Sequence, residues 1–387
     1  MNYKEFFSAD TGSFMRSPVR EIFKRVDLSK IYSFAGGYPS AETFPTEVFE
    51  RLAGEVLHKY GAKALQYGAT QGVTELRQAV SERYGVPVEN IQITTSSQQG
   101  IDVCTRVLVD PGDVVLVSCP SYLGALQSFA SYRAEVVGLD LSPEAGASRI
   151  ARIETLLAEG KKIKFFYAIP DFQNPSGETL TLEQRSSLVD LARKYNFLIV
   201  EDSPYRELRY EGSSVATIYS LAPERTLHLG SFSKIMAPGF RLGWIIGAPE
   251  LLDMIYVCKQ SLDLCPPILD QYIAAEFMAG GELDRNLSKS VALYRDKRDY
   301  MLSLLEKYMP AGVSWTHPEG GLFLFVTLPE GYDTVALYDR ALNAGVAYVA
   351  GSFFFPDGSH RNTMRLNFSF LATERMEAGV KLLASLL

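Results

Sequence analysis

The amino-acid sequence predicts an α/β protein with a large, mostly parallel, seven-stranded sheet between helices and a smaller α+β domain. The chain has 387 residues, 47% of them hydrophobic, which is enough for one large core and a smaller one. Short apolar, β-branched runs alternate with amphipathic stretches through its middle, as in stacked βα units. After about Gly280 this pattern gives way to a long charged stretch and then a strand-rich tail.

Seven short apolar runs are the candidate strands. In order they are IQITT from Ile91, VVLVS from Val114, AEVVGL from Ala134, KFFYAIP from Lys164, FLIVED from Phe197, TLHLGS from Thr226 and WIIGAP from Trp244. Amphipathic segments lie between several of them. One is LEQRSSLVDLARKY from Leu182, whose apolar residues recur at helical spacing.

The ends of the chain differ from its middle. The stretch SKSVALYRDKRDYMLSLLEKYM from Ser288 predicts a helix that leads into a second domain. The first forty or so residues are irregular around SFAGGYPSAETFP, so we expect them to pack onto another domain. We therefore predict an N-terminal segment at 1–45 packed with the small domain, a large domain at 46–284 and a small domain at 285–387.

Charge and composition exclude several classes of function. The net charge of −7 comes from dispersed residues without the basic stripe of a nucleic-acid binder. The N-terminal residues lack the apolar stretch of a signal peptide, and no run of 18 apolar residues follows, so we expect a cytoplasmic protein that binds no membrane. The four cysteines show no CxxC pair and the four histidines are far apart, so no metal site is predicted.

The segment GSFSKIMAPGFRLGW follows a candidate strand and contains Ser231, Ser233, Lys234 and Arg241. A lysine in this setting can form an imine with an aldehyde, while the hydroxyls and the arginine can hold a phosphate. The Pro-Gly pair predicts a turn that folds Arg241 back toward Lys234. A solvated loop lysine with a surface arginine is the alternative.

Asp202 ends the apolar run FLIVED, and Tyr205 follows three residues later. A carboxylate at the carboxyl end of a parallel strand lies where α/β folds build their sites, and its burial is costly without a cation. A protonated pyridine nitrogen is such a cation, and Tyr205 can hydrogen-bond the phenolic oxygen of the same ring. Alternatively, Asp202 caps a helix that begins at Ser203 and Pro204.

Two further motifs follow strands. In YAIPDFQNPSGETL, the Asn174 amide can reach the phenolic oxygen, or the segment is simply a turn. In TTSSQQGID, Ser97 and Gln98 precede an apolar-periodic stretch, so the start of a helix can bind phosphate there, although serine is also a common N-cap. Tyr122, in PSYLGAL, can stack on a flat heterocycle or belong to the core. An aldehyde-bearing, phosphorylated pyridine satisfies all four motifs together.

The chain resembles the fold-type I pyridoxal-phosphate-dependent aminotransferases (class I/II), within the 2-aminoadipate, kynurenine and aromatic aminotransferase branch. The resemblance covers nearly the whole chain. Its motifs are RSPVREIF, SFAGGYPSAETFP, LQYGATQGVTELR, SSQQGID, PSYLGAL, NPSG, EDSPY, SFSKIMAPGFRLGW and MRLNFS.

The resemblance implies pyridoxal 5'-phosphate as cofactor and assigns a role to each matching residue. Catalysis would rest on Lys234 as the Schiff-base lysine, Asp202 at the pyridine nitrogen and Tyr205, with Asn174, at the phenolic oxygen. Tyr122 would stack on the ring, and Ser97, Gln98, Ser231 and Arg241 would hold the phosphate, with Ser233 nearby. Tyr67 would reach the phosphate of the neighbouring subunit, which implies a homodimer.

The same resemblance places the substrate. Arg365 would grip the α-carboxylate, because a planar guanidinium suits a bidentate contact. Gly37 and Asn174 would lie beside that carboxylate, and Arg20 falls in a segment that contacts the substrate side chain in relatives.

The implied activity is transfer of an amino group from a 2-aminoadipate-like, aromatic or branched-chain-like L-amino acid to 2-oxoglutarate, through pyridoxamine phosphate. Two alternatives stay open at this point. A lyase or decarboxylase would use the same cofactor, and a non-catalytic sensor would carry an aminotransferase-like domain behind a DNA-binding module.

Overall fold

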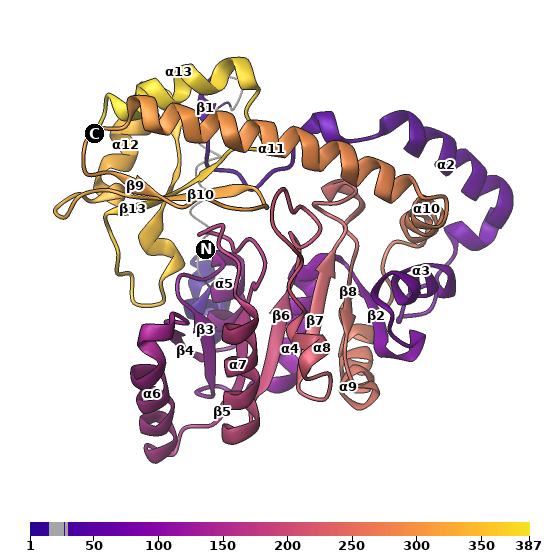
Figure 1. Ribbon diagram of the computed structural model, residues 1–387. Coiled ribbons are helices and arrows are strands. Elements are labelled where there is room, and N and C mark those ends of the chain that lie inside the picture. Colours follow the sequence, from indigo (N-terminus) through magenta and orange to yellow (C-terminus); the bar gives the residue numbers. More distant parts are fainter. Residues whose placement is uncertain (15–26, 28–29) are drawn as a thin grey trace.

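The computed structural model describes residues 1–14, 27 and 30–387 (Figure 1). Among these residues, the largest sheet has seven strands in the order β2-β8-β7-β6-β5-β3-β4. The seven predicted strands are confirmed, and each begins within one residue of its predicted start. Their bounds are β2 (Ile91–Thr94), β3 (Val114–Ser118), β4 (Glu135–Leu139), β5 (Ile163–Ala168), β6 (Leu198–Asp202), β7 (Thr226–Ser231) and β8 (Gly243–Ile246).

Most of the large sheet is parallel, as predicted. Strands β3 to β7 pair in parallel, whereas β8 runs antiparallel to both β7 and β2. Parallel strands end at one edge of a sheet, so Ser118, Ala168, Asp202 and Ser231 come to the same side. That edge is where an open α/β sheet builds its binding site.

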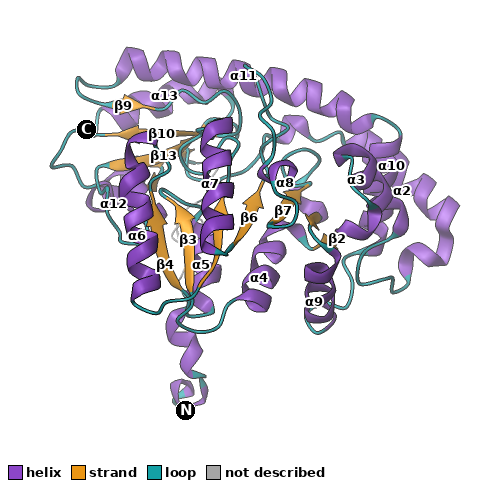
Figure 2. Ribbon diagram, turned by 60° about the horizontal axis from the view of Figure 1, so that its bottom comes forward, coloured by secondary structure: helices purple, strands orange, loops and turns teal. Residues whose placement is uncertain are grey.

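Helices cover both faces of the large sheet, because alternate residues of its strands point to opposite sides. Val114 and Leu116 of β3 pack in one apolar cluster with α6 (Gly146–Ala158), α7 (Leu182–Tyr195) and α8 (Ile218–Leu221). Val115 and Val117 pack in the other with α4 (Ser96–Leu108), α5 (Leu123–Ser131) and α9 (Pro249–Gln260). Figure 2 shows the strands between these helices.

The predicted helix from Leu182 is α7, which begins with a capping box. The Thr181 hydroxyl accepts the backbone N–H of Gln184, and the Gln184 side chain accepts the N–H of Thr181. Three further helices lie beside the β2 edge of the sheet. Helix α3 (Thr74–Tyr84) contacts β2, and α10 (Ile268–Ala279) packs against both α3 and α2 (Thr46–Tyr60).

A smaller sheet lies above the large one in Figure 1. Within the described chain it has the order β12-β13-β10-β9, all antiparallel. The strands are β9 (Ser314–Trp315), β10 (Phe323–Thr327), β12 (Val349–Ala350) and β13 (Thr363–Asn367), accompanied by α12 (Thr334–Ala344) and α13 (Thr373–Ala384). The long helix α11 (Glu282–Tyr308) runs across the molecule to this region and contains the stretch predicted to be helical.

The N-terminal part of the chain returns to the smaller sheet. Strand β1 (Tyr32–Ser33) pairs in parallel with β11 (Val346–Ala347) in a separate two-stranded sheet, and the backbone N–H of Asn367 in the smaller sheet donates to the carbonyl of Phe34. The domain limits at 45/46 and 284/285 stay predictions, and α11 runs continuously through the second of them.

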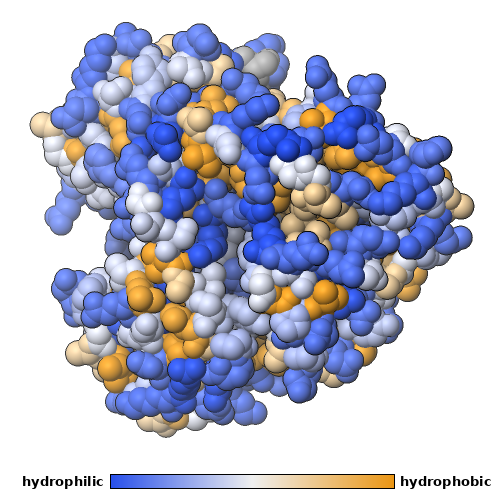
Figure 3. All heavy atoms as spheres, turned by 45° about the vertical axis from the view of Figure 1, so that its right-hand side comes forward, coloured by the Kyte–Doolittle hydropathy of each residue, from blue (hydrophilic) through white to orange (hydrophobic). Residues whose placement is uncertain are grey.

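The surface in Figure 3 is mostly hydrophilic, with separate hydrophobic patches and a hollow between its upper and lower parts. No helix in the described residues is long and apolar enough to cross a membrane.

Candidate active site

A cavity of about 780 Å³ opens at the carboxyl ends of the parallel strands, between the large sheet and the smaller one. Most of the residues predicted for the site line it. They are Gly37, Ser97, Gln98, Tyr122, Asn174, Asp202, Tyr205, Ser231, Ser233, Lys234, Arg241 and Arg365. Tyr67 is not brought there, because it is 78% exposed and outside this lining, and the structure does not describe Arg20.

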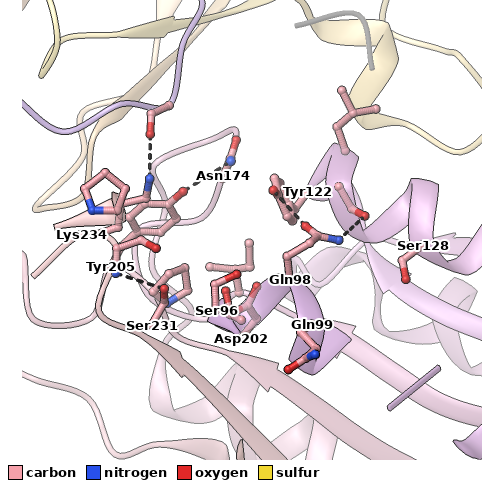
Figure 4. A pocket seen from close by; sticks show the side chains of 18 of the residues that line it. Ser96, Gln98, Gln99, Tyr122, Ser128, Asn174, Asp202, Tyr205, Ser231 and Lys234 are labelled. Atoms are coloured by element: carbon pink, nitrogen blue, oxygen red, sulfur yellow. Dashed lines mark hydrogen bonds between the residues drawn. The ribbon is translucent and has the colours of Figure 1, made fainter. Parts of the chain in front are cut away.

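Lys234 lies three residues beyond the end of β7, in the wall of the cavity. Its Nζ donates to the carbonyl oxygen of Gly37 at 2.7 Å (Figure 4). Burial, helped by the positive charges of Arg365 and Arg241, lowers the pKa of Lys234 to about 8. About a tenth of this amine is therefore neutral, and nucleophilic, at pH 7, far more than for a lysine of ordinary pKa.

Asp202 ends β6 and is only 2% exposed. Its Oδ2 accepts a hydrogen bond from the Tyr167 hydroxyl at 2.7 Å, but its Oδ1 is buried without a hydrogen-bond partner among the described residues. Burial raises the pKa of Asp202 to about 6, although the Tyr167 hydroxyl and His228 act in the opposite direction. The next helix in the described chain is α8, at Ile218, so Asp202 is not a helix cap.

A chain of polar contacts crosses from the small sheet to the large one. Arg365 of β13 donates from Nη1 to Oδ1 of Asn174 at 2.7 Å, and the Asn174 Nδ2 donates to the Tyr205 hydroxyl at 3.5 Å. The guanidinium carbon of Arg365 lies 4.3 Å from the centre of the Phe323 ring. Burial lowers the pKa of Arg365 to about 10, so the group remains a cation at neutral pH.

The start of α4 faces the cavity together with Arg241. Ser97 and Gln98 lie in the first turn of this helix, which begins at Ser96, and the free N–H groups of such a turn attract anions. The Arg241 Nη2 donates to the Ser96 hydroxyl at 2.6 Å. Arg241 has φ 51° and Ser96 has φ 65°, which are left-handed conformations that non-glycine residues uncommonly adopt.

Tyr122 lies at the start of α5 and borders the cavity, rather than being buried in the core. Its hydroxyl donates to Oε1 of Gln98 at 3.2 Å, and Nε2 of Gln98 donates to the carbonyl of Gly124 at 3.1 Å. Figure 4 shows Tyr122 and Gln98 across the cavity from Lys234 and Tyr205. A flat ligand therefore has an aromatic side chain available on one side.

Tyr167 is a site residue that the motifs did not reveal. It lies on β5, next to β6, and its hydroxyl holds the buried carboxylate of Asp202. The alternation of side chains along a strand gives part of the signal. Val200 and Asp202 are two residues apart and so face the same side of the sheet, and Tyr167 packs in the same apolar cluster as Val200. To place Tyr167 beside Asp202, the register between β5 and β6 must also be known, and no local sequence pattern gives that register.

The family model described as "Aminotransferase class I and II" matches residues 35–383. The chain belongs to the class I and II aminotransferases. It is therefore a pyridoxal-phosphate-dependent transaminase of amino-acid metabolism, and its substrates are amino acids and oxo acids. The family prediction is confirmed, and the lyase or decarboxylase alternative is not favoured.

Relatives and solved structures agree with this family. The chain is 44% identical to aromatic-amino-acid aminotransferase 1 of Thermococcus litoralis, over 99% of this chain and 94% of the relative. It is 36% identical to 2-aminoadipate transaminase of Thermus thermophilus, over 98% and 96%. The crystal structure of Pyrococcus horikoshii kynurenine aminotransferase superimposes with a TM-score of 0.95 at 42% identity, covering 100% of this chain and 97% of that one.

The cavity of this aminotransferase fits pyridoxal phosphate. The unpartnered Oδ1 of Asp202 requires a buried cation or donor, and a protonated pyridine supplies one. The first turn of α4 and Arg241 offer N–H groups to a phosphate, and the Lys234 amine is available to an aldehyde.

We predict that cofactor-free protein captures pyridoxal phosphate faster as the pH rises through about 8, and that the rate levels off above it. The lowered pKa of Lys234 means that its reactive neutral form is already predominant above that pH. Stopped-flow absorbance across a pH series measures the rate. N-acetyl-lysine amide, an amine with an ordinary pKa, serves as the reference reaction. A rate that still rises steeply near pH 10 would contradict the prediction.

A second prediction concerns Asp202→Asn. An acid whose pKa is raised in the folded state loses stability as the pH rises from about 4 to about 6, so at pH 7 the whole penalty is present. Removing the charge should therefore stabilise the cofactor-free protein by up to about 3 kcal/mol, while turnover falls by at least about 100-fold. Thermal unfolding of the cofactor-free proteins at pH 4 and pH 7 is the measurement, and equal stabilisation at both pH values would contradict it.

Proposed function

We propose that this aminotransferase moves the amino group of an aromatic or 2-aminoadipate-like L-amino acid to 2-oxoglutarate, with pyridoxamine phosphate carrying it between the two half-reactions. One observation supports this most directly: the buried cation of Arg365 and the amine of Lys234 line the same cavity. An α-carboxylate paired with Arg365 brings the α-carbon of an amino acid into the cavity that contains the amine. The named activities of the relatives support the side-chain class.

The residues proposed to hold the cofactor surround its different groups. Asp202 would meet the pyridine nitrogen, Tyr205 and Asn174 the phenolic oxygen, and Tyr122 one face of the ring. The phosphate would lie against Ser97, Gln98, Ser231 and Arg241, with Ser233 nearby. When bound, pyridoxal phosphate supplies an aldehyde that amines attack and a ring that withdraws electrons from the carbon attached to the amine.

The chain's own residues account for proton movement and orientation. Lys234, which is largely neutral above about pH 8, would take the proton from the α-carbon of the substrate and deliver it to the former aldehyde carbon of the cofactor. Arg365 would fix the carboxylate. Its Nη1 donates to Asn174 and its Nη2 to the carbonyl of Ala35, and these two contacts orient the guanidinium in the cavity. The Tyr167 hydroxyl keeps Asp202 ionised and oriented.

A homodimer in the cytoplasm completes the proposal. Tyr67 is a large aromatic side chain left exposed outside the cavity, as expected if it serves the site of a second copy. Gly37 would approach the substrate carboxylate, beside the Lys234 contact that its carbonyl makes. The predicted role of Arg20 concerns a residue outside the described ones.

The proposal predicts two separate half-reactions. Glutamate added alone to the yellow enzyme should bleach the cofactor absorbance and release 2-oxoglutarate in an amount equal to the active sites. A screen of amino donors against 2-oxoglutarate should then give the largest kcat/KM with aromatic amino acids or 2-aminoadipate. Release of carbon dioxide or ammonia without bleaching would show a decarboxylase or lyase.

Lys234→Ala provides the matched test of the lysine. The variant should lose both the absorbance of the covalently held cofactor and turnover, because no other amine lines the cavity in the described residues. Lys30→Ala is the control, since that lysine is exposed and pairs with Asp27. Unchanged absorbance and turnover in Lys234→Ala would contradict the assignment.

Arg365→Lys should raise KM for amino acids and oxo acids by about 10- to 100-fold, because an ammonium cannot form the bidentate contact. Arg361→Lys is the control. Arg361 lies four residues earlier, is exposed and pairs with Asp333. Steady-state kinetics with both substrates give the comparison, and equal KM values for the two variants would argue against Arg365 as the carboxylate site.

A further inference from the structure

Four consecutive residues after β5, Asp171 to Asn174, link their own loop to the loops after β3 and β6, which also carry proposed cofactor contacts. All four are buried. Asn174 itself lines the cavity, whereas Asp171 and Gln173 point into the surrounding protein and do not. The sequence patterns assigned no role to Gln173, and the proposed mechanism does not use it.

Gln173 uses Nε2 on the loop after β3 and Oε1 within its own loop. Its Nε2 donates to the Ser118 hydroxyl at 3.0 Å and to the carbonyl of Pro120 at 2.6 Å, while its Oε1 accepts from the Ser176 hydroxyl at 2.6 Å. Ser118 ends β3, and Pro120 lies two residues before Tyr122. One side chain therefore joins the loop that carries Asn174 to the loop that carries Tyr122.

The other end of the four residues is fixed by charge. Asp171 is 1% exposed and accepts from Arg185 Nη2 at 2.8 Å and from Arg206 Nη1 at 2.9 Å. Arg185 is fully buried on α7, and Arg206 directly follows Tyr205. Asp171 is therefore held between two cations, while Gln173 holds the following part of the same loop against the loop that carries Tyr122.

We propose that Gln173 is a positioning residue, which sets the distance between Asn174 and Tyr122 so that both meet the same flat ligand. This inference rests on the proposed function of the cavity as the pyridoxal-phosphate site. Gln173 acts only through its two neighbours, because its own side chain does not line the cavity. An amide is suited to the position, since only a group with two donors and an acceptor satisfies all three partners.

The test compares Gln173→Met with Gln184→Met. Gln184 is a matched control, because its Nε2 also donates to a backbone carbonyl, that of Leu141 at 2.9 Å, and its Oε1 also accepts from a neighbouring residue. Gln184 lies on α7 and does not line the cavity. Both substitutions remove a part-buried hydrogen bond from a side-chain amide to the backbone carbonyl of another segment, so a general loss of stability should affect both.

Three quantities are measured on the full-length protein: the dissociation constant of pyridoxal phosphate, the circular dichroism of the bound cofactor and the melting temperature without cofactor. Gln173→Met should weaken cofactor binding by about tenfold, as expected for loss of one to two hydrogen bonds. It should also change the dichroism, whereas Gln184→Met should change neither. Equal cofactor binding and equal dichroism in the two variants would overturn the proposal.

A coupling measurement tests the route through Tyr122 and Asn174. In a Tyr122→Ala or Asn174→Ala background, the loss of affinity caused by Gln173→Met should shrink, because the group being positioned is already absent. Fully additive losses in both backgrounds would overturn the proposal. If Gln173→Met does not fold, Ser118→Ala removes one partner of Gln173 and should weaken binding by about threefold.

The outcome for the unmodified protein separates this inference from the proposed function. If the unmodified chain fails to bind pyridoxal phosphate, the proposed function is wrong and so is the role of Gln173. If it binds, and Gln173→Met equals Gln184→Met, only the role of Gln173 is wrong.

Discussion

The arrangement of the site centres on a buried carboxylate for which the protein supplies a hydrogen bond to only one of the two oxygens. Asp202 lies at the end of a central parallel strand, with one oxygen held by Tyr167 and the other unpartnered among the described residues. Leaving a buried charge in this state is costly, and a fold tolerates it where a ligand completes the contact. The lysine of lowered pKa, Lys234, and the first residue of α4, Ser96, line the same cavity as this carboxylate.

Parallel strands explain why a few short motifs, far apart in sequence, meet in one cavity. The loops after β3, β5, β6 and β7 all begin at the same edge of the sheet. The small sheet then adds Arg365 from above, through β13. Polar contacts between the loops, such as those of Gln173 with Pro120 and of Asp171 with Arg206, hold their side chains in fixed relative positions.

The sequence predicted the large sheet well, because buried strands such as VVLVS and FLIVED are short, apolar and separated by regular helices. It also predicted most of the cavity, since Lys234, Asp202 and Asn174 lie at or within a few residues of the ends of such strands. What it could not supply depends on register and direction: the antiparallel insertion of β8, the contact of Tyr167 with Asp202, and the amide of Gln173. Tyr67 and Arg20 keep their predicted roles untested, because one faces outward and the other lies outside the described residues.

The hydrogen bond from Lys234 to Gly37 has a mechanical consequence. Gly37 lies four residues beyond β1, and β1 pairs with β11, so this bond ties the loop after β7 to the segment that belongs with the small sheet. The position of this amine is therefore set from two sides at once, by the loop after β7 and by the N-terminal segment at Gly37.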